Sequence, residues 1–463
     1  AAVGPLRHAD GSTLFSPGGC RIDVVGYVKT EAPGEYAVDF AGWWPDPLLP
    51  RSGVAARAGE ATPLWLTFAT ADTTAPGVYR GSVEISADGQ PAGSVPLQVT
   101  VHHPVLPDST TVRTAFSLYD DMLEKVYGTE TRAGSRSRRG EAIYLQYRDF
   151  IAAHRLNVTH LYRRSPPGGQ ELAELAARRR LNAANLVNLR AREYTEQELA
   201  AIADSLEATV RFLRSRGLLH LAFIYGFDEA TAADFDNLGA AFGYMKRRFP
   251  DVKTATTAKD PSYGLESGLD EVVDIWVPLT ALYDEDAAAA ARARGKEVWW
   301  YICIDPTAPF ANWFVEYPLL EARLLWWMTW RRGVTGFLYY TLNRWPGGEG
   351  PLGTAAGSNR TGWDPASFGT ANGDGCLIYP GEEGPVSSLR FENVRDGIED
   401  YELLQMLSLR KGDAGAAGRR LCARLMRSLT DFTGDPGEFM STRRQLLEEL
   451  DRLAAGSESG FEE

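Results

Sequence analysis

The feature that most constrains the fold is an alternation of apolar segments with amphipathic helical segments from about residue 110 onward. Such alternation is typical of parallel βα units, because parallel strands need a crossover connection. We expect strands at 112–119, 157–162, 184–189, 220–227, 253–257, 272–277, 297–303 and 336–342. Eight units predict an α/β fold with a (β/α)8 TIM barrel over residues 109–385, and a doubly wound open sheet is the alternative.

Four of the intervening helices are clearest, at 143–154, 195–216, 235–249 and 318–330. The second begins with Thr195 and Glu198, whose spacing resembles a capping box. It is expected to end before Gly217, because glycine commonly follows the last helical residue.

The two ends of the chain differ from this central part. Residues 1–108 contain short alternating segments separated by Gly, Pro and Asp, and they predict a β-sandwich domain. Residues 343–385 are predicted to form a long loop, and loops of this length in a compact domain are usually functional. Segments at 387–409, 418–432 and 440–455 predict a C-terminal helical segment over 386–463.

The composition excludes several classes of function. The chain has 463 residues, which suggests two or three domains. It carries 48 Lys and Arg against 61 Asp and Glu, and this net charge of −13 argues against a nucleic-acid binder. The apolar stretches are shorter than the roughly 20 residues of a membrane helix, so no membrane span is expected. Oligomeric state is not predicted.

No metal and no organic cofactor is expected. The cysteines at 20, 303, 376 and 422 form no Cys-x-x-Cys pair, and the histidines form no His-Glu-x-x-His motif. A Gly-x-Gly-x-x-Gly match at 348–353 contains Pro351 and precedes no helix, which argues against a dinucleotide site. The start of the chain shows no signal peptide. We expect a bacterial protein that is secreted or periplasmic after removal of any signal peptide, with a cytoplasmic location as the alternative.

Asp228 and Glu229 are the candidate catalytic residues. The dipeptide Asp-Glu occurs three times, so its presence alone carries little information, but only this copy follows a fully apolar strand. In a barrel, the active site lies at the carboxyl ends of the strands. Consecutive strand residues point to opposite faces, so the chain must turn at the pair if both carboxylates serve one site.

The other expected strand ends are rich in aromatic, amide and carboxylate side chains, and they include Tyr119, Tyr162, Asn188 and Tyr301. Aromatic faces stack on sugar rings, and sugar hydroxyls need directed donors and acceptors. The alternative is that many of the aromatic rings are core. This lining favours a carbohydrate as the substrate.

Adjacent carboxylates suggest a particular glycosidase mechanism. Two-carboxylate glycosidases keep the two groups about 5–5.5 Å apart for retention and farther apart for inversion. A sequence-adjacent pair better fits substrate assistance, in which the 2-acetamido oxygen of the sugar attacks the anomeric carbon. One carboxylate then stabilises the acetamido nitrogen, and the other is the general acid and base.

The chain resembles glycoside hydrolase family 123 and its relatives with the C-terminal domain of unknown function 4091. The resemblance rests on 43–50 (WWPDPLLP), 76–81 (PGVYRG), 228–229 (DE), 372–380 (NGDGCLIYP) and, most specifically, 390–402 (RFENVRDGIEDYE). It implies an N-terminal β-sandwich, a (β/α)8 barrel and β-N-acetylgalactosaminidase activity. The expected partner is a glycan or glycoconjugate with terminal β-GalNAc.

The resemblance also implies residue roles. Asp228 matches the acetamido-stabilising Asp and Glu229 the general acid/base. Tyr301, from its strand end, is predicted to bind the acetamido carbonyl. The remaining candidate sugar contacts are Asn343, Trp345, Trp363 and Asp374. The string around Asp374 is alternatively a turn or a weak cation loop.

Three hypotheses for the function follow. The first is an exo-acting retaining β-N-acetylgalactosaminidase. The second is a β-N-acetylglucosaminidase or a glycosidase for another sugar, and the third is a non-catalytic carbohydrate-binding protein.

Residues 395–402 are interpreted as a buried brace that opens a helix, with Arg395 and Glu399 as an i,i+4 pair.

Overall fold

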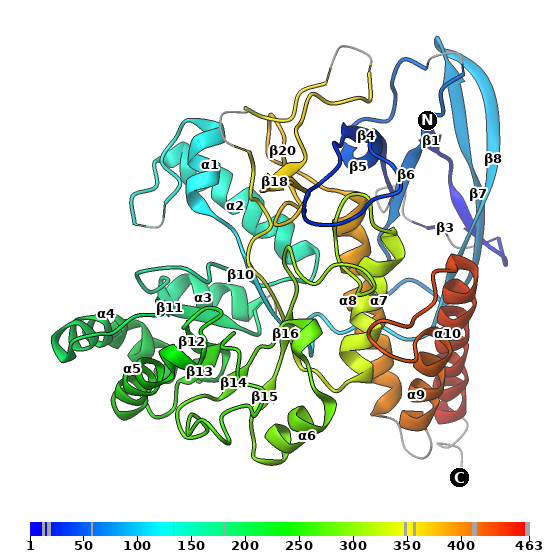
Figure 1. The fold of residues 1–463 in the computed structure, drawn as a ribbon. Coiled ribbons are helices and arrows are strands. Elements are labelled where there is room, and N and C mark those ends of the chain that lie inside the picture. Colours follow the sequence, from blue (N-terminus) through cyan, green and yellow to red (C-terminus); the bar gives the residue numbers. More distant parts are fainter. Residues whose placement is uncertain are drawn as a thin grey trace.

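The protein is described here by a computed structural model, which covers residues 1–11, 14–15, 20–56, 59–132, 134–178, 181–346, 350–354, 358–409 and 414–458. The glycine-rich match at 348–353 and the predicted loop at 343–385 lie partly outside these residues. Figure 1 shows antiparallel strands on one side, an α/β part on the other, and the helices α7 (Leu319–Arg331) and α8 (Leu389–Ser408) between them. Among the described helices, none combines the length and apolar character needed to cross a membrane.

The α/β part is built on parallel strands at the predicted places. The strands are β9 (Arg113–Ser117), β10 (Val158–Thr159), β11 (Ala184–Leu189), β12 (Ala222–Gly226), β13 (Lys253–Thr256), β14 (Ile275–Trp276), β15 (Glu297–Val298), β16 (Trp300–Tyr301) and β17 (Gly336–Tyr339). Each lies within one of the eight predicted segments, and every ladder between them is parallel. The predicted order of strands is therefore confirmed.

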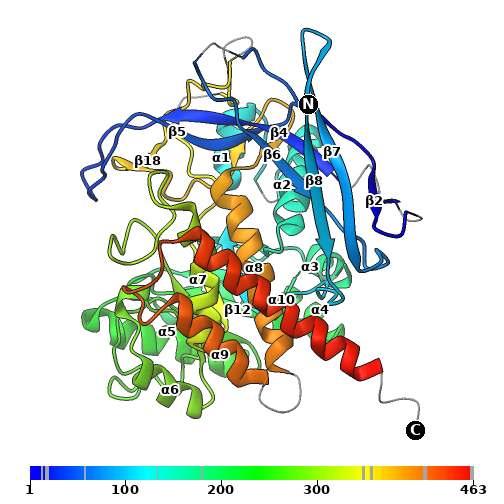
Figure 2. The ribbon, with the colours of Figure 1, turned by 90° about the vertical axis from the view of Figure 1, so that its right-hand side faces the viewer.

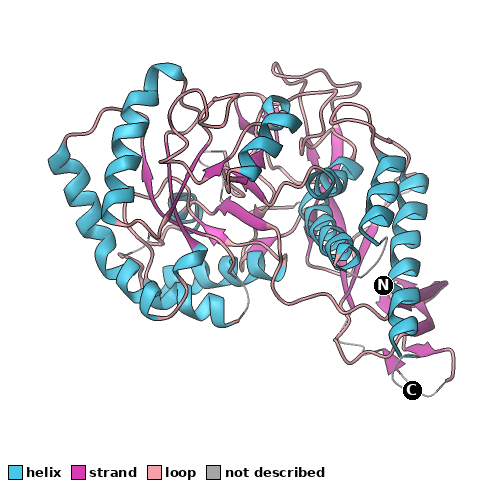
Figure 3. Cartoon of the chain, turned by 90° about the horizontal axis from the view of Figure 1, so that it is seen from below, coloured by secondary structure: helices cyan, strands magenta, loops and turns pink. Residues whose placement is uncertain are grey.

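A closed (β/α)8 barrel is not confirmed. The ladders form two sheets, with strand orders β10-β9-β17-β16 and β11-β12-β13-β14-β15. β15 and β16 belong to the same segment of chain, so the two sheets meet there. Between β10 and β11 no ladder joins the described strands. The fold is a mixed α/β arrangement with parallel sheets, and helices lie around the outside of its strands (Figure 3).

The helices of this part follow the predicted pattern. They are α1 (Asp120–Tyr127), α2 (Arg138–Ala153), α3 (Gly169–Ala177), α4 (Glu196–Ser215), α5 (Phe235–Arg248), α6 (Glu285–Ala293) and α7 (Leu319–Arg331), with short 3-10 turns at Leu219–Leu221, Ala232–Asp234 and Thr280–Leu282. The capping box of α4 is confirmed, because Thr195 and Glu198 bond each other's backbone N–H groups. Gly217 follows with φ of 69°, as a glycine after a helix can.

The described part of the first hundred residues is all β, as predicted. The strands are β1 (Ala2–Val3), β2 (Leu6–His8), β3 (Leu14–Phe15), β4 (Cys20–Lys29), β5 (Trp43–Leu49), β6 (Leu64–Phe68), β7 (Gly77–Ala87) and β8 (Gln90–Val101). They form antiparallel sheets of five and three strands, and β5-β4-β6 is the smaller one. Val24 and Val28 of β4 belong to the same buried cluster as Phe116 of β9. The smaller sheet thus shares the core of the α/β part. Figure 2 shows its strands next to one end of helix α8.

The C-terminal part is helical, with one difference from the prediction. Its helices are α8 (Leu389–Ser408), α9 (Ala414–Leu425) and α10 (Pro436–Glu458). The predicted helix at 418–432 ends at Leu425, because the chain folds back there: Thr433 N–H donates to Leu425 O and Met426 pairs with Phe432. The long loop before α8 contains two small hairpins, made of β18 (Ala366–Phe368), β19 (Ala371–Asn372), β20 (Tyr379–Pro380) and β21 (Pro385–Val386).

The interpretation of 395–402 as a buried brace is confirmed. Asp400 is fully buried and accepts from Nε of Arg323 on α7 and from Nε of Arg443 on α10, each at 2.7 Å. Glu402 is also buried and accepts the N–H of Thr111 at 2.8 Å, just before β9. These carboxylates therefore tie α8 to α7, to α10 and to the first strand of the α/β part.

The predicted pair of Arg395 with Glu399 is wrong. Arg395 instead pairs with Glu392 and with Asp396. Glu399 pairs with Arg155, which follows α2, at 3.1 Å. The helical spacing permits either arrangement, and the position of α2 selects the one observed.

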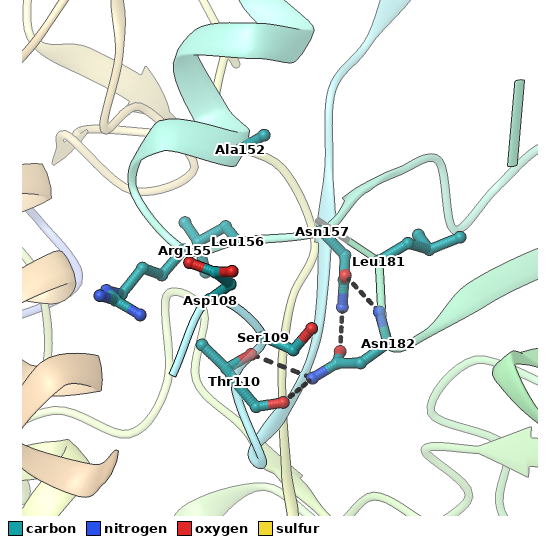
Figure 4. A pocket seen from close by; sticks show the side chains of 9 residues that line it. All are labelled: Asp108, Ser109, Thr110, Ala152, Arg155, Leu156, Asn157, Leu181 and Asn182. Carbon is teal, nitrogen blue, oxygen red and sulfur yellow. Dashed lines mark hydrogen bonds between the residues drawn. The ribbon is translucent and has the colours of Figure 1, made fainter. Parts of the chain in front are cut away.

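A small cavity lies at the amino ends of the strands. Figure 4 shows it lined by Asp108, Ser109, Thr110, Ala152, Arg155, Leu156, Asn157, Leu181 and Asn182. Asn182 donates to Thr110 O at 2.7 Å and accepts from Asn157 Nδ2 at 2.6 Å. The free volume of about 10 Å³ is close to the minimum for one water molecule. The residues at this edge of the sheets therefore have a structural role.

Candidate active site

Asp228 and Glu229 lie in a sharp turn at the carboxyl end of β12. The residues on either side of Asp228 are left-handed, with φ of 52° at Phe227 and 49° at Glu229. A side chain on Gly226 would come within 2.6 Å of Leu189 O, so β12 needs a glycine to pass β11 before the turn. The predicted turn at the carboxylate pair is confirmed. Left-handed non-glycine residues are costly and concentrate at functional sites.

Asp228 is held by hydroxyl groups. Tyr225 donates its hydroxyl proton to Oδ1 of Asp228, and Thr257 donates to the same oxygen at 3.0 Å. Both donors are buried, and they come from β12 itself and from the residue after β13. Both bonds end on Oδ1, and the hydroxyl of Tyr162 is a third neighbour of this carboxylate.

The surroundings of Asp228 act on its pKa in opposite directions. The side chain is reachable by water but has protein atoms on most sides, and this desolvation raises its pKa. The hydroxyls of Tyr225, Thr257 and Tyr162 lower the pKa, and the charge of Glu229 raises it. The net effect is an upward shift, so Asp228 is more easily protonated than an ordinary surface Asp.

Glu229 is also fixed by neighbours from the following strands. Tyr301, at the end of β16, donates its hydroxyl to Oε1 at 2.6 Å. The N–H of Glu229 donates to Oγ1 of Thr257 at 2.8 Å. Nζ of Lys259 lies 3.7 Å from Oε2, and both side chains are about 45% exposed (45% and 44%), which makes this a weak, screened ion pair. Glu229 is therefore accessible to a substrate while its direction is set.

Aromatic side chains that follow β9 and β10 stand beside the pair. Tyr119 packs against His160, with ring centroids 5.3 Å apart, and against Tyr162 at 6.2 Å. Tyr162 in turn meets Tyr225 edge to face. Burial, with help from Arg163, lowers the pKa of His160 to about 4, so its ring is neutral at pH 7. The lining is therefore aromatic and largely uncharged on this side.

Asp374 lies deeper, beneath tyrosines of β17 and its end. Tyr340 donates to Oδ2 at 2.9 Å and Tyr339 donates to Oδ1 at 3.4 Å. Burial raises the pKa of Asp374 to about 6, against the effect of these donors and of Arg344. Nearby Cys303 is a neutral thiol, because burial raises its pKa to about 12. Cys303 is therefore unsuited to act as a nucleophile.

The other predicted contacts are placed differently. The Asn343 amide is fully buried. It accepts the N–H of Tyr119 at 2.8 Å and donates to Tyr119 O at 3.0 Å. Trp345 is core, and its indole donates to Ile378 O at 2.7 Å. Trp363 is buried edge to face with Tyr379. None of the three bonds Asp228 or Glu229, and their contact with a sugar stays a prediction.

The sequence interpretation missed Thr257, Tyr225 and Lys259. Thr257 and Lys259 follow β13, so their position at a strand end was available as a signal, whereas Tyr225 lies inside an apolar run. Across the described part of the chain, no group of three or more His, Cys, Asp or Glu side chains is arranged to hold a metal ion. The chemistry available at this site is that of two carboxylates, tyrosine hydroxyls and one amine.

Comparisons with known proteins agree with this site. Residues 182–407 match the family model described as the catalytic domain of glycoside hydrolase 123, and this range contains the carboxylate pair. A comparison with curated proteins gave no match.

One solved structure supports the fold. A family 123 glycoside hydrolase from Clostridium perfringens, studied for glycolipid glycan hydrolysis, superposes with a TM-score of 0.70 at 13% identity and covers 99% of this chain and 89% of its own. A family 39 glycoside hydrolase from Bacteroides cellulosilyticus gives 0.35 at 10% identity, with 83% and 78% covered, which is too weak to bear on the fold. The family match identifies residues 182–407 as glycoside hydrolase 123-like, and the first of these likenesses supports the fold.

Proposed function

We propose that the chain is an exo-acting, retaining β-N-acetylgalactosaminidase that hydrolyses terminal β-GalNAc with the help of the sugar's own 2-acetamido group. Asp228 stabilises the acetamido group, and Glu229 is the general acid and base. The observation that carries the proposal is the pair of left-handed residues, Phe227 and Glu229, which turn the chain so that adjacent carboxylates can serve one site.

In the first step, Glu229 gives its proton to the glycosidic oxygen while the acetamido oxygen attacks the anomeric carbon. The bond from that carbon to the leaving group breaks, and a bond to the acetamido oxygen forms. Asp228 accepts the acetamido N–H and offsets the positive charge that develops there, a charge that itself favours the ionised carboxylate.

In the second step, Glu229 removes a proton from a water molecule, which attacks the anomeric carbon from the face that the leaving group has left. The bond to the acetamido oxygen breaks and the acetamido group is restored. Two inversions give net retention. Tyr301 donates its hydroxyl to Glu229 in the free protein. When the sugar is bound, a shift of this one hydroxyl proton to the acetamido carbonyl is part of the proposal.

Two finer structural points belong to the proposal. The parallel strands are taken to work as a barrel whose carboxyl ends face the substrate. Residues 1–108, 109–385 and 386–463 are taken as sandwich, catalytic and helical regions. Because the similar C. perfringens enzyme was studied with glycolipid glycans, such glycans are substrates to test here alongside other terminal β-GalNAc compounds.

The first prediction concerns the two carboxylates. Glu229→Gln should lower kcat by about 10²–10⁴-fold, the range for loss of a general acid. Asp228→Asn should lower it by about 10²–10³-fold on nitrophenyl β-GalNAc, because an electrostatic partner of the transition state is lost. Steady-state rates on nitrophenyl β-GalNAc, β-GlcNAc and β-galactoside measure both effects and the sugar preference.

Matched controls make the outcome decisive. Lys259→Met removes the weak ion pair and should change rates far less than either carboxylate variant. An Asp228→Asn protein with undiminished turnover of nitrophenyl β-GalNAc would refute substrate assistance. Faster turnover of nitrophenyl β-GlcNAc than of nitrophenyl β-GalNAc would favour a β-N-acetylglucosaminidase. Sugar binding without turnover would favour a carbohydrate-binding protein.

A further inference from the structure

One hydroxyl group contacts both proposed catalytic residues. Oγ1 of Thr257 donates to Oδ1 of Asp228 at 3.0 Å and accepts the N–H of Glu229 at 2.8 Å. It also lies 3.0 Å from the hydroxyl of Tyr225. Thr257 is 2% exposed, so this hydroxyl is not exchanged for water when a substrate binds.

The preceding threonine holds the other side of the turn. Thr256, the last residue of β13, donates its hydroxyl to Phe227 O at 3.1 Å. Consecutive strand residues usually point to opposite faces, yet both side chains bond the same turn, one before Asp228 and one after it. The two left-handed residues, Phe227 and Glu229, are thus each bonded by one threonine of the neighbouring strand.

We propose that Thr257 is a positioning residue of the reaction: its single hydroxyl sets the direction of the Asp228 carboxylate and of the Glu229 backbone together, and Thr256 fixes the turn between them. The inference rests on the roles given above to the two carboxylates. It goes beyond them because it makes activity depend on a neutral side chain that touches neither the sugar nor the leaving group.

The hydroxyl protons around Oδ1 favour one protonation state of Asp228. A threonine and a tyrosine hydroxyl have one proton each, and both are given to Asp228 when it is ionised. The contact between Tyr225 and Thr257 then carries no proton of its own. Protonation of Asp228 would weaken both bonds, because a neutral acid accepts less strongly than a carboxylate, so the two hydroxyls favour the ionised form.

The test compares Thr257→Val, which keeps the shape and loses the hydroxyl, with Thr257→Ser, which keeps the hydroxyl. Thr257→Val should lower kcat/KM on nitrophenyl β-GalNAc about 10²-fold, as expected for misplaced reacting groups. Because the hydroxyl lowers the pKa of Asp228, its loss should also move the acid limb of the pH profile to higher pH. Thr257→Ser should restore both the rate and the limb.

A matched control is Thr209→Val on α4, which removes a buried hydroxyl bonded to Pro167 O at 3.2 Å. It should lower thermal stability without moving the pH profile. If Thr257→Val does not fold, as judged by circular dichroism, Tyr225→Phe provides the second test. This variant removes the other donor to Asp228 and should move the acid limb in the same direction, with Glu229 still held.

A Thr257→Val enzyme with the wild-type rate and acid limb would overturn the inference, and so would a Thr257→Ser enzyme as impaired as the valine variant. A rate loss with an unmoved acid limb would overturn it as well, since a purely structural role predicts that result. Asp228→Asn and Glu229→Gln are measured alongside. If these two remain active, the proposed function fails; if they are inactive while Thr257→Val is normal, only this inference fails.

Discussion

At the scale of single residues, the turn that carries the catalytic pair stores backbone strain. Left-handed φ at Phe227 and Glu229 costs roughly 1–2 kcal/mol at each residue. The cost is offset locally by the hydroxyls of Thr256 and Thr257, which bond the two strained residues. The geometry in return presents adjacent carboxylates to one space, which a regular strand cannot do.

This strain predicts an unusual order of stabilities. Glu229→Gly and Glu229→Ala both remove the carboxylate and should both be inactive. The glycine variant should be more stable than the alanine variant by about 1 kcal/mol, because only glycine adopts φ of 49° without a Cβ clash. Urea unfolding of the two proteins measures the difference.

The control is a position at which glycine should be less stable than alanine. Ala201 is exposed within α4, where glycine is the poorer residue, and Ala201→Gly should cost about 1 kcal/mol. If the alanine variant at 229 proved the more stable of its pair, the turn would not be strained in the way described.

Residue type explains what the sequence could show of the site. Asp228 and Glu229 were found because carboxylates after a fully apolar strand have few structural explanations. Asn343 and Trp345 were named for side chains that suit a sugar, yet the same groups bond buried backbone here. Thr257 was missed because a threonine at a strand end is ordinary until its partners across the sheet are known.

At the scale of elements, the order of the strands could be predicted from the sequence, but closure of the sheet into a barrel could not. Apolar runs and intervening helices indicate where strands begin, and all eight segments contain parallel strands. Whether β10 pairs with β11 depends on hydrogen bonds between neighbours, which no periodicity records. Helix α9 ends early for a similar reason, since Phe432 pairs back onto Met426.

Helix α8 is the element most dependent on buried charge. Glu392 is fully buried and bonds Ser387, His154 of the α2 end, Arg21 of β4 and Arg395. Burial alone would raise its pKa, but the bond and charge of His154, the charge of Arg395 and the bond of Ser387 prevail and lower the pKa to about 2. A carboxylate with a lowered pKa stabilises the fold above its ordinary value of 4.5.

Glu392→Gln should therefore lower the free energy of unfolding at pH 7 by about 3 kcal/mol, the low end for breaking a buried pair. The gap to wild type should close as the pH falls from 4.5 to about 2, where the wild-type carboxylate also becomes neutral. Denaturant melts at several pH values measure it. Glu399→Gln, which removes a partly exposed partner of Arg155, should cost under about 1 kcal/mol, and a flat pH dependence for Glu392→Gln would contradict the expectation.

At the scale of the whole molecule, the three regions share structure that their sequence patterns do not show. Val24 and Val28 of β4 enter the main core, and Leu389 of α8 packs against Val25 and Leu48 of the small sheet. Tandem composition changes suggest separate domains, but the shared core predicts that they unfold as one cooperative body. Only side-chain contacts between distant segments reveal this.

Residues 109–463 produced alone should therefore lack cooperative thermal unfolding and should bind hydrophobic dyes. Removal of residues 1–108 takes away core side chains and leaves the buried Arg390 without Asp46, whose carboxylate it bonds at 2.8 Å. Production of both pieces together should restore a single transition. A sharp transition of the shorter piece alone, near the wild-type temperature, would contradict this view.

The ion pair of Asp46 and Arg390 can form only late in the synthesis of the chain, because the two residues are far apart in the sequence. The two residues are 344 positions apart, and Arg21 and Glu392 are 371 apart. At ribosomal rates of about 5–20 residues per second, helix α8 is synthesised on the order of tens of seconds after the β5-β4-β6 sheet. During synthesis, Asp46 stays hydrated and one apolar face of the β5-β4-β6 sheet stays open. The strands β4, β5 and β6, although made early, are thus completed late, and this is the interval in which a chaperone would matter most.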